Sequence, residues 1–230
     1  MGADEEPAEV FADLARDLCT LGADGVARRV TAVAPGLVPG CEDAAICLLD
    51  RHGGVVPAAA TSERAALADR LQHEAGEGLC LTAIRGVART APDLLGNDGG
   101  PIAEATGIRC MLGVPLVAGT DLLGALTLSC GTPYAFDARA VTTARILASH
   151  AAVALAGAAA RRRGAELAEA LQSSRVIGMA LGVVMAQRRL TPEQAFDLLR
   201  RASQRQGRKV REVAADVVET GQVPVGARVR

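Results

Sequence analysis

The spacing of hydrophobic and polar residues separates a first part with predicted strands from a second part that is all helical. Apolar positions at helical spacing predict a helix over 5–33. Short apolar runs at 44–49 and 55–60 flank a turn-forming Asp-Arg-His-Gly-Gly segment and predict a hairpin. Two longer runs, 110–117 and 122–128, are separated by Ala-Gly-Thr-Asp and predict a second pair of strands. Strands with helices before, between and after them predict an α+β fold with antiparallel pairing.

Beyond Asp137 the pattern becomes helical, and one stretch has the spacing of a coiled-coil seam. Its apolar and small residues recur at alternating steps of four and three positions. The predicted dimer seam consists of Leu167, Leu171, Ser174, Gly178 and Leu181. A long dimerising helix explains this spacing, and so does a single buried amphipathic helix.

Two shorter helices are predicted after the seam. Residues 191–194 read TPEQ, in which Thr can cap the helix, Pro fits the first helical position and Gln completes a capping box. Gly207 ends this helix, and Gly221 ends a last one. We therefore expect three helices with short connections at the C-terminal end, followed by a flexible tail over 223–230.

The composition is that of an ordinary globular protein. Hydrophobic residues make up 50% of the chain and charged residues 22%, which supplies packed cores and argues against global disorder. No basic start is followed by a long apolar run, so we expect no secretory signal. The apolar stretches are interrupted before the roughly 18 residues that a membrane span needs. A cytoplasmic protein without membrane contact is the expectation.

The six cysteines all lie in the first 160 residues, and their spacing does not indicate a metal site. None forms a C-x-x-C pair or a Cys/His cluster with zinc spacing. In a reducing cytosol we expect six free thiols, most of them buried. We expect no metal site, and the sequence does not identify a cofactor. The cysteines are Cys19, Cys41, Cys47, Cys80, Cys110 and Cys130.

Charge is divided unequally between the two parts. Residues 1–160 carry a net charge of −8 and residues 161–230 a net charge of +7, although the whole chain carries only −1. Such asymmetry is expected when one part binds a polyanion and the other does not. A basic solvated face that binds nothing would produce the same division.

The C-terminal part carries a series of motifs in fixed order. Residues 174–185 read SRVIGMALGVVM, residues 191–203 read TPEQAFDLLRRAS, and residues 209–214 read KVREVA. This series resembles the ANTAR domain over about residues 165–220. The resemblance implies a three-helix RNA-binding module that acts mostly as a dimer on paired stem-loops. Many ANTAR domains carry Lys before the Gly of the first helix, where this chain has Leu181, so it must do without that cation.

Basic side chains concentrate in the same part of the chain, around one predicted turn and the two helices that it joins. Arg and Lys that meet phosphates release counterions, and Arg can bind a phosphate through two parallel hydrogen bonds. The predicted RNA-binding residues are Arg175, Arg188, Arg189, Arg200, Arg201, Arg205, Arg208, Lys209 and Arg211. Three short helices also describe helix-turn-helix proteins that read DNA, and only the ANTAR resemblance favours RNA.

The ANTAR resemblance also assigns a core to the three helices. Phe196, the only aromatic residue of this part, lies on the apolar stripe, so we expect a core residue rather than a base-stacking surface. The predicted core consists of Ala180, Gly182, Met185, Ala195, Phe196, Leu199, Ala202 and Ala214.

The first part resembles GAF domains of the kind joined to ANTAR modules, over about residues 8–157. The resemblance rests on HEAGEGLCL at 73–81 and GIRCMLGVPL at 107–116, and on three shorter segments. These shorter segments are APDL at 91–94, LGALTL at 123–128 and AFD at 135–137. The resemblance implies an antiparallel sheet flanked by helices, with a pocket on one face for a small ligand that the sequence does not identify.

These resemblances together predict a signal-responsive regulator. A GAF-like sensor domain over 1–157 and an ANTAR domain over 158–222 would bind structured RNA as a homodimer and control transcription antitermination or translation. The alternative is a dimeric protein-interaction adaptor with weak or no specific RNA binding. We do not expect an enzyme, because the chain has no nucleophile elbow, phosphate-binding Gly-Lys-Ser/Thr or zinc-protease His motif.

Overall fold

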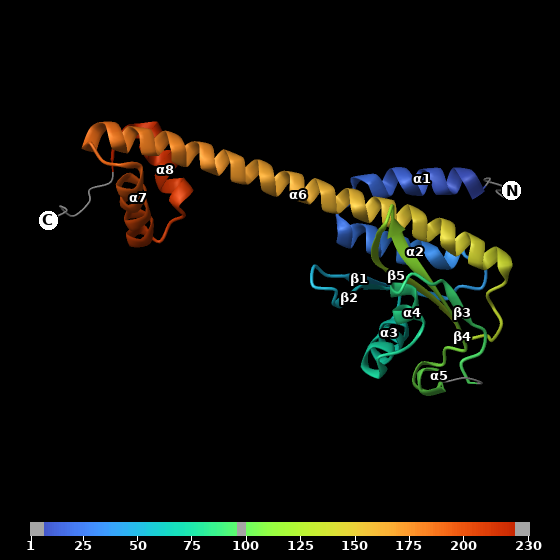
Figure 1. Ribbon diagram of the computed structural model, residues 1–230. Helices are drawn as coiled ribbons and strands as arrows, with labels where there is room; N and C mark the ends of the chain where they lie inside the picture. Colours follow the sequence, from blue (N-terminus) through green and yellow to red (C-terminus); the bar gives the residue numbers. More distant parts are fainter. Residues whose placement is uncertain (1–6, 96–99, 224–230) are drawn as a thin grey trace. The chain divides into compact units, whose positions relative to one another are not determined.

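The computed structural model describes residues 7–95 and 100–223, and its contacts divide the chain into two compact units (Figure 1). Unit 1 extends to Ala160, and unit 2 begins at Arg161. The division lies three residues beyond the boundary that the sequence predicts, and it falls inside a long helix. Each unit has a hydrophobic core of its own.

Unit 1 contains one five-stranded antiparallel sheet with the strand order β2-β1-β5-β4-β3. Both hairpins expected from the sequence are present, because β1 pairs with β2 and β4 pairs with β5. The central pairing of β1 with β5 joins the two hairpins. The α+β class and the antiparallel sheet are therefore confirmed. The strands are β1 (Asp43–Leu49), β2 (Val55–Ala60), β3 (Arg89–Ala91), β4 (Cys110–Ala118) and β5 (Asp121–Cys130).

Side chains alternate between the two faces of the sheet, as the period of two in a strand requires. On β5, Leu126 and Leu128 belong to the main core, whereas Ala125 belongs to a separate small cluster. On β1, Ile46 belongs to the main core and Cys47 to that small cluster. Both faces of the sheet are therefore covered.

The helices form a layer on each face of the sheet (Figure 1). One layer consists of α1 (Pro7–Thr20), α2 (Ala23–Leu37) and the first part of α6 (Ala138–Arg188). The other layer consists of α3 (Glu63–Ala75), α4 (Leu79–Ile84) and α5 (Gly100–Thr106). The single helix expected over 5–33 is wrong, because the structure divides it at Leu21 and Gly22. Gly22 has an extended backbone and forms the N-cap of α2.

Two glycines allow α4 to lie close to its neighbours. A Cβ atom on Gly113 of β4 would lie 2.6 Å from the carbonyl oxygen of Leu79. A Cβ atom on Gly78, whose φ is +133°, would lie 2.5 Å from the Gln72 side chain. Because glycine has no Cβ atom, the start of α4 can lie this close to the sheet and to α3.

Unit 2 consists of the last part of α6 and two short helices, α7 (Pro192–Gln206) and α8 (Val210–Thr220). The expected capping box is confirmed: Thr191 Oγ1 accepts from the Gln194 amide, and Gln194 Oε1 accepts from the Thr191 amide. Gly207 ends α7 in the left-handed conformation that glycine adopts readily. Val223 packs into this core, and the rest of the tail expected at 223–230 lies outside the described residues.

Helix α6 runs without interruption through the Arg-Arg-Arg-Gly segment at 161–164. One window of 18 residues in α6 has a mean hydropathy of 1.3, and 44% of this window is buried inside the protein. Such a helix is weak evidence for a membrane span.

Candidate nucleic-acid interface

Small residues allow the three helices of unit 2 to pack closely. Four alanines of this core are completely buried: Ala180 on α6, Ala195 and Ala202 on α7, and Ala214 on α8. Leu199 on α7 is also completely buried and is the largest of these side chains. Met185 packs against this core and is partly buried. Six of the eight predicted core residues therefore contribute to the core.

Gly182 and Phe196 are the two exceptions, and the structure contradicts their assignment to the core. Gly182 is exposed, and 40% of Phe196 is exposed. The inner face of α7 is formed by Ala195, Leu199 and Ala202, at helical spacing. Phe196 is one position away from this line, about 100° around the helix. An exposed aromatic side chain is therefore present among the basic residues.

The predicted RNA-binding residues lie at two turns and on the helices that these turns join. Arg188 and Arg189 lie where α6 meets α7, whereas Arg208 and Lys209 lie where α7 meets α8. Because α7 has 15 residues, its two ends are about 22 Å apart. Arg188 and Arg189 therefore lie about one length of α7 away from Arg208 and Lys209.

Four predicted residues of unit 2 already interact with acidic or other partners. Arg200 pairs with Asp197 at 2.8 Å on the same helix. Arg208 pairs with Asp216 at 2.6 Å and holds the pKa of that carboxyl below its ordinary value. Arg211 of α8 pairs with Glu169 of α6. Arg205 also has an interaction within the structure. A phosphate would have to compete for these side chains.

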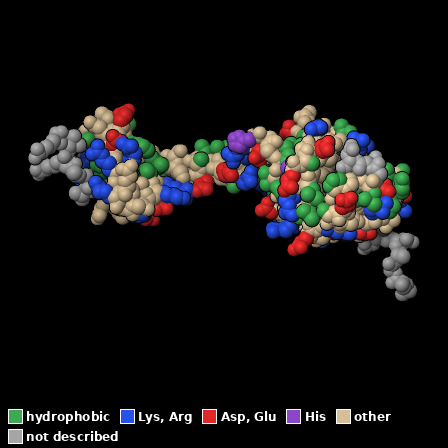
Figure 2. Space-filling model, turned by 90° about the horizontal axis from the view of Figure 1, so that it is seen from below, with side chains coloured by type: hydrophobic (Ala, Val, Ile, Leu, Met, Phe, Trp, Pro, Cys, Tyr) green, Lys and Arg blue, Asp and Glu red, His purple; other side chains and the backbone are tan. Residues whose placement is uncertain are grey.

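The other predicted cations have no ion-pair partner in the part of the chain that the structure describes, 7–95 and 100–223. They are Arg175, Arg188, Arg189, Arg201 and Lys209, and all five are exposed. Figure 2 shows Arg and Lys side chains gathered on the lobe that contains α7 and α8. These five side chains are the predicted RNA-binding cations that an added polyanion could bind without displacing a carboxylate.

The predicted dimer seam is mostly open in the structure. Leu167 and Leu171 are 62% and 63% exposed, and Ser174 and Gly178 are exposed as well. Leu181 differs, because it packs against the core of unit 2 and is only partly accessible. The seam is therefore available to a partner over its first four positions.

A second group of polar side chains lies under α3 and α4 in unit 1. Cys47, Asp69 and Cys80 are buried there with their ligand atoms within 4.8 Å of one another. Sequence spacing missed this group, because the three residues belong to three different elements and follow no known motif. Their closeness is visible only in the folded chain.

Family models match both parts of the sequence. The GAF domain matches residues 20–156, and the ANTAR domain matches residues 165–218. No curated protein matches the chain.

Solved GAF structures share the fold of unit 1. The GAF domain of a phosphoenolpyruvate-protein phosphotransferase from Coxiella burnetii is 19% identical, with a TM-score of 0.54 over 69% of this chain and 96% of that chain. The corresponding Acinetobacter domain is 15% identical, with a TM-score of 0.53 over 69% and 97%. A free methionine-R-sulfoxide reductase from Neisseria meningitidis is 16% identical, with a TM-score of 0.52 over 70% and 96%. These identities support the fold alone.

The GAF match covers more than half of the chain, and the ANTAR match follows it directly. The sheet with its two helical layers and the three-helix unit agree with these two assignments. The chain therefore belongs to the GAF domain family and, with an ANTAR domain after its GAF domain, is a GAF–ANTAR regulator.

Proposed function

We propose that this protein is a cytoplasmic, signal-responsive regulator that binds paired RNA stem-loops as a homodimer. Through this binding it controls transcription antitermination or translation. The ANTAR domain supports RNA binding, and the GAF domain supports a sensor role with a small ligand. We place the sensor domain at 1–157 and the RNA-binding domain at 158–222.

One observation carries the choice of ligand. Arg188 and Arg189 at one end of α7 and Lys209 at the other end have no ion-pair partner among the described residues, and about 22 Å separates the two ends. Arg201 lies between them, on the same helix. A single nucleotide is too short to reach both ends. A folded RNA carries phosphates over this length and suits the arrangement.

The surface of α6 supports the homodimer. Ile146, Val153 and Leu167 are 42%, 66% and 62% exposed, and their positions differ by multiples of seven. Residues that repeat every seven positions along a helix lie on the same face of a coiled coil. The exposed apolar residues of α6 therefore continue the register of the predicted seam toward its N-terminal end. A second copy of the same helix would bury them.

Helix α6 also offers a route from signal to RNA. It contributes Leu147 and Leu155 to the core of the GAF domain and Ala180 and Val184 to the core of the ANTAR domain. A change in register or rotation of the paired helices would reach both cores. A ligand-dependent change in RNA affinity without any change in helix pairing would exclude this route.

The test of RNA binding uses the full-length protein and three nucleic acids of equal length. These are a pool of stem-loop RNAs, an unstructured RNA and a DNA duplex, each measured at two salt concentrations. We expect selective binding of one class of stem-loops, weakened by salt. Binding that is weak and equal for all three would refute the proposal and favour the adaptor, in which Leu181 replaces the family's usual Lys.

The test of the dimer places charges in the seam. Leu167→Glu combined with Leu171→Glu should dissociate the dimer, because two like charges would face their copies across the interface. Ala165→Glu with Gln172→Glu adds the same charge to exposed positions outside the seam and serves as the control. Sedimentation equilibrium measures both. A wild-type monomer, or equal dissociation of both variants, would refute the seam.

A further inference from the structure

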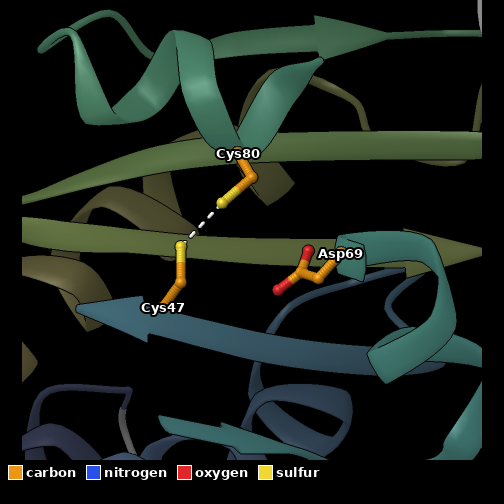
Figure 3. A group of neighbouring side chains, drawn as sticks. All are labelled: Cys47, Asp69 and Cys80. Atoms are coloured by element: carbon orange, nitrogen blue, oxygen red, sulfur yellow. Dashed lines mark hydrogen bonds between the residues drawn. The ribbon is translucent and has the colours of Figure 1, made fainter. Parts of the chain in front are cut away.

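Three buried polar side chains converge between the sheet and the α3–α4 layer of the GAF domain. Cys47 comes from β1, Asp69 from α3 and Cys80 from α4, and they are only 1%, 6% and 0% exposed. In Figure 3 the two sulfur atoms point toward each other, and the carboxylate approaches from the side. The Cys47 and Cys80 Sγ atoms are 2.6 Å apart, and all three ligand atoms lie within 4.8 Å of one another.

The scaffold around this cluster is well defined. The buried Gln72 side chain accepts a hydrogen bond from the Cys80 amide at 2.9 Å through its Oε1 atom. Its Nε2 atom donates to the Ala68 carbonyl oxygen at 3.3 Å and lies 3.5 Å from Asp69 Oδ1. Gln72 thereby fixes the first turn of α4 relative to α3. The positions of the three side chains are therefore set by a strand and two helices.

The polar groups of the cluster are buried with few partners beyond one another and Gln72, whose Nε2 atom lies 3.5 Å from Asp69 Oδ1. Asp69 has no ion-pair partner within the described parts of the chain, and its burial raises the pKa of the carboxyl to about 7. The Cys47 thiol and burial both raise the pKa of Cys80. Thr127 Oγ1 lies beside Asp69 and Cys80, and only 3% of Thr127 is exposed. Desolvating several polar side chains at one place costs free energy, so this grouping requires an explanation.

We propose that Cys47, Asp69 and Cys80 form a binding site for one thiophilic divalent cation of the Zn²⁺ class. Two sulfur atoms and one carboxylate oxygen are a donor set that Zn²⁺ accepts, and it prefers four ligands in a tetrahedron. The Thr127 hydroxyl or a water molecule supplies the fourth. The cation would replace the thiol protons, which are released on binding, and it would link β1, α3 and α4. This site is independent of RNA binding and would give the sensor domain a metal as its ligand.

The distances are compatible with this occupant after a small adjustment. Zn–S bonds of about 2.3 Å place two sulfur ligands about 3.8 Å apart. The two thiols, now 2.6 Å apart, must therefore separate by about 1.2 Å, which side-chain rotation can provide. The carboxylate oxygen of Asp69 lies within 4.8 Å of both sulfur atoms.

A reversible disulfide between Cys47 and Cys80 is the rival explanation. A disulfide bond of about 2.0 Å would need the sulfurs to approach by about 0.6 Å from their present 2.6 Å. This oxidation would involve neither the Asp69 carboxylate nor the Thr127 hydroxyl beside it. A cation accounts for all four residues, and on this ground the metal site is preferred.

The experiment uses the full-length protein, freed of metal by a chelator and kept reduced by a phosphine. Zn²⁺ is titrated in competition with a chromophoric chelator, and Co²⁺ is added separately to observe thiolate-to-cobalt absorption. We expect one ion per chain, near-ultraviolet charge-transfer bands with Co²⁺ and an increase in the thermal midpoint, because the cation binds only the folded chain.

Three variants make the result specific. Cys80→Ser and the isosteric Asp69→Asn should each weaken Zn²⁺ binding by between about 10-fold and about 100-fold. Cys110→Ser is the matched control, because Cys110 is equally buried but belongs to the main core on the other face of the sheet. It should bind Zn²⁺ as the wild type does. Circular dichroism confirms that each variant is folded before the titration.

Two results would overturn the metal site. One is a reduced wild-type protein that binds no ion, with or without a Cys47–Cys80 disulfide detected by mass spectrometry after oxidation. The other is an equal loss of binding in Cys110→Ser and Cys80→Ser, which would show that the ion binds elsewhere. Neither result bears on RNA binding, since no RNA is present in the measurement.

Discussion

The five predicted RNA-binding cations that have no ion-pair partner among the described residues lead to a quantitative prediction about salt. Each phosphate contact contributes between about −0.7 and −0.9 to the slope of log K against log salt concentration. If Arg175, Arg188, Arg189, Arg201 and Lys209 each contact one phosphate, the slope per protomer is between about −3.5 and −4.5. Raising salt from about 50 to about 200 mM should then weaken binding by about 130-fold to about 500-fold.

A triple variant tests this reasoning. Arg188→Gln, Arg201→Gln and Lys209→Gln together remove three of the five cations without breaking an ion pair. The two remaining contacts give a slope between about −1.4 and −1.8, so the same increase in salt weakens binding by only about 7-fold to about 12-fold. Fluorescence anisotropy with one stem-loop RNA over a salt series measures both slopes.

A control with the same loss of charge separates contact from net charge. Arg51, Arg139 and Arg145 are exposed residues of the GAF domain, and their replacement by Gln removes three positive charges there. We expect the control to keep the wild-type slope. A triple variant with an unchanged slope, or a control that loses as much as the triple variant, would refute the assignment of these contacts.

Three further predictions concern the RNA surface, the seating of α4 and acid stability. Phe196→Ala should weaken RNA binding by about 1–3 kcal/mol if the exposed ring stacks on a base, whereas Phe196→Tyr should not; equal affinities in anisotropy would exclude stacking. Gly113→Ala should lower the free energy of unfolding by about 1–3 kcal/mol, because its Cβ would lie 2.6 Å from a backbone oxygen of α4; an unchanged urea midpoint would contradict this close approach. Arg64 pairs with Glu42 at 2.6 Å and with Asp43 at 2.5 Å, and the pKa values of both carboxyls are lowered. The stability that these pairs contribute is present above pH 4.5 and is lost as pH falls through the lowered pKa values. Arg64→Gln should therefore destabilise the protein by about 1 kcal/mol near pH 7 and by progressively less in acid; a difference that does not change between pH 7 and pH 2 would contradict the pairing.

Local patterns predicted the elements that have strong local signals. The strands β4 and β5 follow from long apolar runs, and the start of α7 follows from Thr191 and its capping box. The helices α4 and α5 were not predicted, because they have only six and seven residues and show no helical period. The break at Gly22 was also missed, since apolar residues continue at helical spacing on both sides of it.

The candidate site shows a similar division. The sequence predicted a set of basic residues for the RNA surface, because composition and motif order depend on the chain alone. It did not show that Arg208 and Arg211 are held by Asp216 and Glu169, or that Arg201 is not held by any described residue. Ion pairs between helices depend on how the helices pack, which no local pattern specifies.

The sequence by itself therefore determined the two families, the α+β class, the hairpins and the basic character of the C-terminal part. These properties depend on residue order and local spacing, which the chain states directly. Only the tertiary structure decided that Phe196 is exposed and that Cys47 lies 2.6 Å from Cys80, a residue 33 positions away in the chain. Contacts of this kind arise when a strand and a helix that are distant in sequence pack on the same face of a sheet, so they follow from the fold and not from spacing along the chain.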